Sequence, residues 1–555
     1  MKSHYRKLLE YADRGVENTL KRQCLDVMSP EFGGFPEMRK GFTEHSAGIG
    51  NAVSLAVLYY NEDSRYHRDE RLLLAANRAA DFTLSKQHED GTIDLVETNI
   101  HCAATMGFTL QNVVPGYRVI KKYNQHTPGE DELQEKILRY ITKGADGMVT
   151  GGFHTPNHRW VIASALALCY NEIGRQDLLD EIDLYLNEGI DCNPQGEWTE
   201  RSAGIYNKVN NDGMIIMAEE LGKWELLEHA RRNLFMMFNY LEPDDTIFTM
   251  NSHRQDIGQK MYPMKYYENF LMTAHYLKDP HLAYMADYLF RMVNDYEGDT
   301  GPLGAGNIPK CISRYMLHDF LRENELEKEK YDWTDYEVFY DLSNIVRRRN
   351  GDAITTIIGD SPMFMKFQKG LNQVFIRFAA SFFGTEGRFT PDSLVKIDGG
   401  YRLHYRSDWG YVRPLGKPDR PTKNGHTNIE HRERANMQVF EVNIDILPFD
   451  DGVRVDIDSM GVEGLPCKLE MIYEPGGFFD CDQTEFKASG GQHIMVRYGK
   501  YDYIKGNDTI RVEGAFGNTN YHNELRGSYP EVPDAFTVYF TDWSPTKRTV
   551  IFKGL

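Results

Sequence analysis

The chain has 555 residues, of which 41% are hydrophobic and 26% are charged, and its formal net charge is −19. These values are typical of globular proteins and argue against extensive disorder, and the length predicts two or more domains. The acidic balance argues against nucleic acid and against an anionic membrane as partners, because both bind positively charged surfaces.

The first 335 residues carry a helical pattern. Apolar residues recur there at three- and four-residue spacing, which predicts an almost unbroken series of helices. Several of these segments are apolar on more than one face, as expected of an inner ring of helices that an outer ring covers. The pattern predicts twelve helices, near residues 4–26, 45–60, 67–86, 102–124, 131–147, 158–174, 177–189, 204–221, 223–241, 263–277, 281–295 and 310–325.

Twelve helices taken in pairs fit an (α/α)6 toroid over residues 1–335. Such a toroid is a ring of helical hairpins with its active cleft at one end. A superhelical array of hairpins is the alternative, because the sequence contains no strict repeat that would distinguish the two arrangements.

Near residue 345 the pattern changes to short alternating segments rich in β-branched and aromatic residues, separated by Gly, Asn and Asp. The first two predicted strands lie in NGDAITTIIGDSPMFMKF, and others follow to the end of the chain. This pattern predicts an antiparallel β-sandwich over residues 345–555. The acidic segment 323–337 is the expected surface connector, so the predicted fold class is multidomain, with α and β parts.

Seven widely spaced cysteines, with no CxxC pair, predict buried reduced thiols instead of a disulfide framework. The amino-terminal sequence MKSHYRKLLEYADRG lacks the apolar stretch of a signal peptide, and the sequence has no run of 18 apolar residues. We therefore expect a cytoplasmic protein without a membrane span.

The segment 151–206 is the most informative part of the sequence. GGFHTPNHRW places Asn157, His158 and Arg159 at the start of an apolar helix, and GEWTERSAGIY ends on Tyr206, 48 residues after His158. An amide, an imidazole, a guanidinium and a phenol are the groups that β-elimination from a uronic acid glycoside needs. Asn157 is also a preferred N-cap residue, and the two roles are compatible.

Elimination removes the proton at C5 of a uronate and expels the oxygen at C4, so the carboxylate must be neutralised while charge moves into it. We expect Asn157 to donate N–H groups to that carboxylate, with His158 or Arg159 adding a charged donor. Tyr206 is the expected proton shuttle. A histidine of the sandwich, His404 or His426, is the candidate base if base and leaving group lie on opposite faces of the sugar.

Other polar clusters precede predicted helices and are candidates for binding substrate. Asn99 and His101 lie in a predicted loop before a helix. Arg254, in NSHRQDIGQKMY, is a candidate to bind a second sugar carboxylate, and a contact network between loops is the alternative. Glu200 and Arg201 precede Tyr206 and are expected to bind substrate or to orient the phenol.

Four segments together resemble the heparinase II/III-like family of polysaccharide lyases. The resemblance implies a helical toroid followed by a β-sandwich, with an Asn or His before an inner helix and a catalytic Tyr about fifty residues later, as Asn157, His158 and Tyr206 are placed. The segments are DGTIDLVETNIHCAATMGF, GGFHTPNHRWVIASALA, GIDCNPQGEWTERSAGIY and RFAASFFGTEGRF.

The sequence departs from this family at the start of the sandwich. A segment of the form GxHxHxD is missing, and the nearest stretch is NGHTNIEHRER at 424–434. We accordingly expect no metal and no cofactor. The expected partner is an acidic oligosaccharide or polysaccharide substrate, and a homodimer is one option for the assembly.

Two other functions fit the same pattern. A glycoside hydrolase on the same toroid would use paired carboxylates, which Asp94, Glu97, Glu200 and Asp256 could supply. A non-catalytic glycan-binding protein would bind sugar without turnover. Formation of a conjugated unsaturated uronate, which absorbs ultraviolet light, distinguishes elimination from both.

Overall fold

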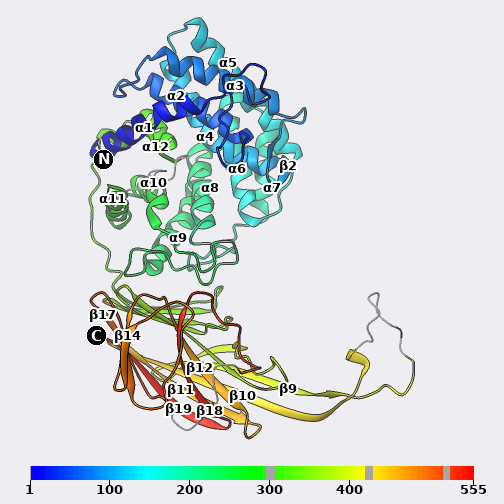
Figure 1. Cartoon of the computed structure of the whole chain (residues 1–555). Helices are drawn as coiled ribbons and strands as arrows, with labels where there is room; N and C mark the ends of the chain where they lie inside the picture. Colours follow the sequence, from blue (N-terminus) through cyan, green and yellow to red (C-terminus); the bar gives the residue numbers. More distant parts are fainter. Residues whose placement is uncertain (1, 295–306, 324, 419, 421–428, 517–524) are drawn as a thin grey trace. The chain divides into compact units, whose positions relative to one another are not determined.

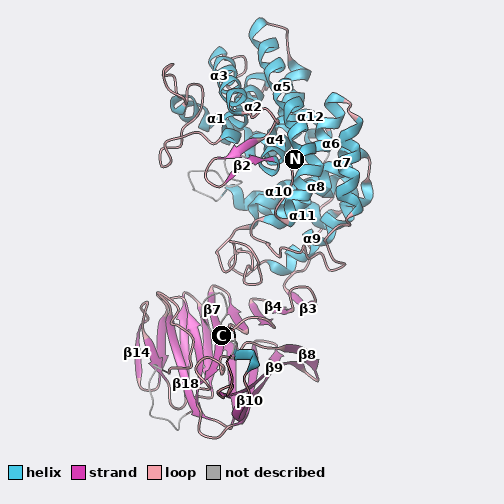
Figure 2. Cartoon of the chain, turned by 90° about the vertical axis from the view of Figure 1, so that its right-hand side faces the viewer, coloured by secondary structure: helices cyan, strands magenta, loops and turns pink. Residues whose placement is uncertain are grey.

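The computed structural model describes residues 2–294, 307–323, 325–418, 420, 429–516 and 525–555 (Figure 1). The chain divides into two compact units. One unit contains Met1–Leu241 and Thr246–Tyr331, and the other contains Glu242–Asp245 and Asp332–Leu555. The first is helical and the second consists mainly of strands (Figure 2).

Each of the twelve predicted helices has a counterpart in the structure, and the predicted segment 310–325 is divided into two helices. None of the described helices combines the length and hydrophobicity needed to cross a bilayer. The helices are α1 (Lys2–Arg22), α2 (His45–Tyr60), α3 (Glu70–Lys86), α4 (Ala103–Tyr123), α5 (Pro128–Thr150), α6 (Pro156–Ile173), α7 (Gln176–Asn187), α8 (Tyr206–Leu221), α9 (Leu227–Tyr240), α10 (Tyr267–Leu277), α11 (Pro280–Asn294), α12 (Asn307–Leu317) and α13 (Phe320–Glu323).

Helices α2, α4, α6, α8 and α10 pack against one another in that order, and α12 packs against α2 and α4. Helices α4, α6 and α8 are buried on several faces, whereas α3, α5 and α7 bury one stripe each and pack on α2, α4 and α6, respectively. The α6–α8 contact is close, because a Cβ at Gly213 would lie 2.9 Å from the carbonyl oxygen of Trp160. This contact brings the starts of α6 and α8 into one region.

A short hairpin replaces the loop that was expected before α4. Strands β1 (Ile93–Leu95) and β2 (Asn99–Cys102) pair antiparallel, with a register shift between Ile93 and Leu95. Three- and four-residue strands are too short for an alternating pattern to be recognised in the sequence. The hairpin places Asn99 and Cys102 directly before the first turn of α4.

The second unit contains two large sheets. Their strand orders are β14-β13-β16-β17-β19-β11-β10-β9-β8 and β15-β18-β12-β7-β6-β5-β4-β3. Neighbours pair antiparallel, except that β15 and β18 are parallel. Buried side chains from both sheets, such as Phe367 and Ile376 on one and Phe440 and Val455 on the other, form a single apolar cluster.

Strands of this unit occur throughout the region where the alternating pattern was found. Their bounds are β3 (Asp335–Tyr340), β4 (Ile345–Asn350), β5 (Ala353–Ile358), β6 (Met365–Lys369), β7 (Asn372–Ala380), β8 (Ser393–Ile397), β9 (Gly400–Val412), β10 (Arg434–Phe449), β11 (Gly452–Gly461), β12 (Pro466–Tyr473), β13 (Phe478–Cys481), β14 (Thr484–Lys487), β15 (His493–Met495), β16 (Lys500–Lys505), β17 (Asp508–Glu513), β18 (Phe536–Trp543) and β19 (Thr546–Gly554).

The second unit begins earlier in the sequence than the predicted sandwich did. Strand β3 lies partly within the acidic segment expected to be a connector, and the arginine-rich strand β4 follows it. Arg347 of β4 is fully buried beside Glu242, with Nη1 at 3.2 Å from Oε1, and Lys366 Nζ lies 3.1 Å from the same oxygen. A partner about a hundred residues away therefore allows an arginine to occupy a core position.

Loss of the Glu242 carboxylate should destabilise the second unit, because Arg347 and Lys366 would then remain buried without their counter-charge. We expect Glu242→Ala to cost about 3–5 kcal/mol, measured by urea unfolding. Arg402→Ala breaks the more exposed ion pair with Asp445 and serves as the control, with an expected loss of about 0–1 kcal/mol. Equal losses in the two variants would contradict a structural role for Glu242.

Candidate active site

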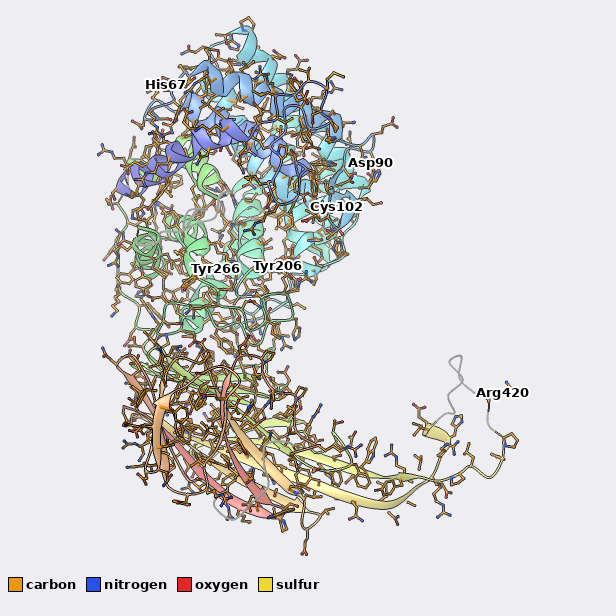
Figure 3. The ribbon with its side chains drawn as sticks, in the orientation of Figure 1. His67, Asp90, Cys102, Tyr206, Tyr266 and Arg420 are labelled. Atoms are coloured by element: carbon orange, nitrogen blue, oxygen red, sulfur yellow. The ribbon has the colours of Figure 1, made fainter. Side chains whose placement is uncertain are left out.

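The helical unit contains a cleft with a volume of about 890 Å³. Its walls come from α2, the β1–β2 hairpin, α4, the starts of α6 and α8, the loop before α10 and helix α12. Tyr206 and Cys102, two of its residues, are labelled in Figure 3. The lining residues are Arg22, Ser46, Ala47, Gly50, Asn51, Val53, Ser54, Leu95, Thr98, Asn99, Cys102, Thr105, Phe108, Thr109, Asn112, His154, His158, Tyr206, Arg254, Gln255, Lys310 and Ser313.

The lining has an unusual charge for a chain with 82 acidic residues. Among the described lining residues there is no aspartate or glutamate, whereas Arg22, Arg254 and Lys310 are cationic. Lys310 is buried and its Nζ lies 3.2 Å from Oδ2 of Asp212, which is not a lining residue. Hydroxyls and amides supply most of the remaining polar surface. The cleft therefore suits an anionic, hydroxyl-rich ligand.

His158 lies in the first turn of α6, where Pro156 occupies an early position that needs no N–H donor. Its ring makes edge-on contacts with His154 and Phe108, with centroids 4.6 and 6.0 Å away. Burial, and then the positive charges of His154 and Arg254, lower the pKa of His158 to about 4. The imidazole is neutral near pH 7, so it can accept a proton, but it cannot act as the charged donor that was one of its predicted roles.

Tyr206 is the first residue of α8, and its backbone N–H donates to Ser202 Oγ at 3.1 Å. The Gln255 side-chain amide donates to the phenol oxygen at 2.8 Å, and the Arg254 guanidinium lies over the ring, 4.8 Å from its centroid. An amide donor at the oxygen and a cation over the ring both stabilise negative charge that develops on this oxygen.

Buried polar contacts fix the first two turns of α8 behind the cleft. Lys208 Nζ lies 2.5 Å from Asp212 Oδ2, and the amide of Asn269 donates to Asp212 Oδ1 at 2.6 Å. The amide of Asn211 donates to Asn233 Oδ1 at 2.8 Å. These contacts satisfy groups that would be costly to bury alone. They make α8 a rigid support for its first residue.

Asn157 lies behind the cleft instead of lining it. The side chain is fully buried, and its amide nitrogen donates to Thr155 Oγ1 at 3.1 Å and to Glu200 Oε2 at 2.8 Å. Both amide hydrogens are thus directed at protein oxygens, and the predicted contact between Asn157 and a substrate carboxylate is absent from this arrangement.

Glu200 connects Asn157 to the cleft. Its other oxygen, Oε1, lies 3.4 Å from Nη1 of Arg254, the residue stacked on Tyr206. Burial raises the pKa of Glu200, against the opposing effects of the Asn157 hydrogen bond and the Arg254 charge. Glu200 is not a lining residue, and its two oxygens contact Asn157 and Arg254.

Arg159 is directed away from the cleft. Its two terminal nitrogens lie 3.1 Å from Glu188 Oε2 and 3.1 Å from Asp191 Oδ1, and its guanidinium stacks on Trp160. Successive helical residues point roughly 100° apart, so the consecutive residues 157, 158 and 159 cannot all face one cleft. Of the three, only His158 does.

The two candidates in the β1–β2 hairpin have different positions. Asn99 lines the cleft, as expected. His101 instead stacks on His88, with ring centroids 3.9 Å apart, and its Nδ1 lies 2.6 Å from Asp90 Oδ2. Arg201 is likewise outside the lining residues.

His404 belongs to the second unit, on β9. Its Nδ1 lies 2.7 Å from Asp392 Oδ1 and its Nε2 lies 3.3 Å from Glu441 Oε1. Burial lowers the pKa of His404, but the hydrogen bonds to Asp392 and Glu441 outweigh this effect and raise it overall. Both ring nitrogens of His404 are already engaged by carboxylates of the same unit, so the predicted role as a base has no support here. His426 lies outside the described residues.

Several lining residues were not predicted from the sequence. Gln255 was visible beside Arg254 but was not selected. The lining polar residues of α2 and α4, such as Asn51, Ser54 and Asn112, carry a weak signal, because they form polar stripes on otherwise apolar helices. Among the described residues there is no group of three or more His, Cys, Asp or Glu side chains that could hold a metal ion.

No family model matches the sequence, and no curated protein matches it. Solved structures match over nearly the whole chain. A heparinase III has 11% identity and a TM-score of 0.53, with 95% of this chain and 77% of that chain covered. The chondroitin AC lyase of Streptomyces coelicolor A3, in complex with chondroitin sulphate, has 9% identity and a TM-score of 0.58, with 99% and 79% covered.

Another heparinase III has 9% identity and a TM-score of 0.56, with 98% of this chain and 84% of that chain covered. Identities this low establish a shared fold and no more. The chain therefore has the fold of these polysaccharide lyases, and the predicted resemblance is confirmed at that level.

The two histidines with displaced pKa values give a direct check on the site. In an NMR titration, the ring of His158 should protonate near pH 4, because burial disfavours its charged form, whereas His404 should protonate above the 6.5 of an ordinary histidine. His158→Gln and His404→Gln assign the two signals. A midpoint for His158 at or above that of His404 would contradict the described environment.

Proposed function

We propose that the protein is a lyase that cleaves a uronic acid-containing oligosaccharide or polysaccharide by β-elimination. We also propose that its helical unit is an (α/α)6 toroid and that its β-rich unit is a β-sandwich. The observation that carries the proposal is the composition of the cleft. His158, Tyr206, Arg254 and Gln255 line it together, and none of the lining residues in the described part of the chain is a carboxylate.

In this proposal Arg254 binds the uronate carboxylate and stabilises the negative charge that moves into it. The neutral imidazole of His158 takes the proton from C5. The C5–H electron pair forms the C4–C5 double bond as the bond from C4 to the leaving oxygen breaks. Tyr206 gives its proton to that oxygen, since the hydrogen bond from Gln255 occupies a lone pair of the phenol and leaves its hydrogen available.

The glycoside hydrolase alternative needs two carboxylates in the cleft. The four candidates, Asp94, Glu97, Glu200 and Asp256, are all outside the lining residues. Asp94 accepts from the His101 backbone N–H and lies 2.8 Å from His88 Nε2, and Glu97 lies 2.5 Å from Lys40 Nζ. Because none of these four carboxylates lines the cleft, the structure gives no support to a hydrolase mechanism.

Removal of the Tyr206 hydroxyl tests catalysis directly. We expect Tyr206→Phe to lower kcat by at least about 10²-fold, because general acid catalysis commonly contributes that much. The assay follows ultraviolet absorbance of the unsaturated product from heparan sulphate, chondroitin sulphate and other uronate polymers. Tyr262→Phe, a partly exposed tyrosine outside the lining residues, is the control. Binding without turnover in the unmodified protein would favour the glycan-binding alternative.

Charge recognition by Arg254 is tested by a matched pair of arginine variants. Arg254→Gln removes a charge-assisted hydrogen bond worth about 1.5–3 kcal/mol, so kcat/KM should fall roughly 10- to 100-fold. Arg159→Gln, which alters an arginine already paired with Glu188 and Asp191, should leave kcat/KM nearly unchanged. A larger loss of kcat/KM in Arg159→Gln than in Arg254→Gln would indicate that Arg159, and not Arg254, binds the substrate.

A further inference from the structure

Asp256 is a buried aspartate that the proposed reaction does not use. It lies in the loop between α9 and α10 and is 1% exposed. Its Oδ1 accepts hydrogen bonds from Ser202 Oγ at 2.8 Å and from Ser252 Oγ at 2.5 Å. Its Oδ2 accepts from the backbone N–H of Gly204 at 2.8 Å. One carboxylate thus joins the segment before α8 to the loop that carries Arg254 and Gln255.

The two serines repeat one arrangement. Ser202 Oγ accepts the backbone N–H of Tyr206 at 3.1 Å, and Ser252 Oγ accepts the backbone N–H of Arg254 at 3.1 Å. Each serine hydroxyl therefore links the Asp256 carboxylate to the backbone N–H of a cleft residue and fixes the position of that backbone. Because a carboxylate can only accept, each serine must donate to it and turn a lone pair toward the N–H.

The backbone at Gly204 packs closely against Asp256. A Cβ at Gly204 would lie 2.6 Å from Asp256 Oδ2 and 2.9 Å from Met261 Cγ. Tyr266, labelled with Tyr206 in Figure 3, donates its hydroxyl to the carbonyl oxygen of Ala203 at 2.5 Å. The segment 202–206 is therefore held from both sides.

We propose that Asp256 is a positioning residue that sets the Tyr206 phenol against Arg254 and Gln255 through Ser202 and Ser252. The inference rests on the proposed function for its effect on turnover. Asp256 is not a catalytic residue, because it lies outside the cleft lining and accepts only from groups of the protein.

Asp256→Asn keeps the shape of the side chain but reverses one hydrogen bond. If the amide oxygen faces the serines, the NH2 group meets the N–H of Gly204. If the amide turns over, the NH2 group faces two hydroxyls that must then give up donating to this site. The first arrangement repels Gly204, in the segment that leads to Tyr206, and the second disturbs the serine hydroxyls that accept the N–H groups of Tyr206 and Arg254. A shift of about 1 Å can cost about 10²-fold in rate.

The experiment measures kcat and KM of Asp256→Asn, Ser202→Ala and Ser252→Ala with uronate polymers. Asp256→Asn should lower kcat about 10²-fold. Ser202→Ala should lower kcat and leave KM nearly unchanged, because Tyr206 acts on the leaving oxygen, whereas Ser252→Ala should also raise KM, because Arg254 binds the uronate carboxylate before and during the reaction. A merely structural role predicts no such division between the two serines.

Asp13→Asn is the matched control. Asp13 is also buried and accepts from a serine hydroxyl, Ser64 Oγ at 2.6 Å, and from a backbone N–H, that of Arg65 at 3.1 Å, but neither residue lines the cleft. The Asp13→Asn variant should be less stable in urea unfolding, while its kcat and KM should stay near those of the unmodified protein. Equal losses of kcat in Asp256→Asn and Asp13→Asn would overturn the proposal.

A second measurement separates this inference from the proposed function. In protein with 13C-labelled tyrosine, the Tyr206 signal is assigned by its loss in Tyr206→Phe. It should move in Asp256→Asn and Ser202→Ala and stay in place in Asp13→Asn. If it moves while the unmodified protein shows no elimination, the positioning role stands and the lyase proposal falls. An unmoved signal in Asp256→Asn would refute the positioning role whatever the activity.

Discussion

The site depends on the placement of the Arg254 guanidinium between the carboxylate of Glu200 and the ring of Tyr206. A guanidinium is charged throughout the physiological pH range and has several N–H donors. A buried carboxylate can therefore orient it through one donor while others remain available to bind an anion. The 3.4 Å separation from Glu200 is longer than that of a tight ion pair. Arg254 is thereby oriented while it remains one of the residues that line the cleft.

The surrounding structure supports this placement from two directions. On one side, the Asn157 amide in the first turn of α6 donates to Glu200 and also to Thr155, and so holds the Glu200 carboxylate. On the other, the buried polar turns of α8 fix the helix that begins with Tyr206. Many of these groups are amides and charged side chains in a helical interior, where apolar residues would pack at lower cost. Their hydrogen bonds define one geometry, which an apolar core of the same volume would not impose.

The positions and order of the long helices could be predicted from the sequence, because period-3.6 patterning is strong in long segments. The division of the last predicted helix into α12 and α13 could not. The β1–β2 hairpin and strand β4 could not. The hairpin is too short to show alternation, and the buried arginine of β4 depends on Glu242, which is distant in sequence. Residue type and spacing selected His158, Tyr206, Asn99 and Arg254, which all line the cleft. Arg159 and His101 were also selected but are not among the lining residues, because residue type does not reveal which way a side chain points at a helix start or in a tight hairpin.

The path of the chain has a consequence for how the molecule folds. The chain passes between the two units three times, at 241/242, 245/246 and 331/332. A fragment that starts at Asp332 would contain every strand of the second unit but not Glu242, and so would enclose two cations without their anion. The β-rich unit is thus completed by four residues from the middle of the helical sequence. These four residues directly follow α9 in the chain and are synthesised before the strands. The second unit can therefore complete its folding only with a segment that is joined to the helical unit.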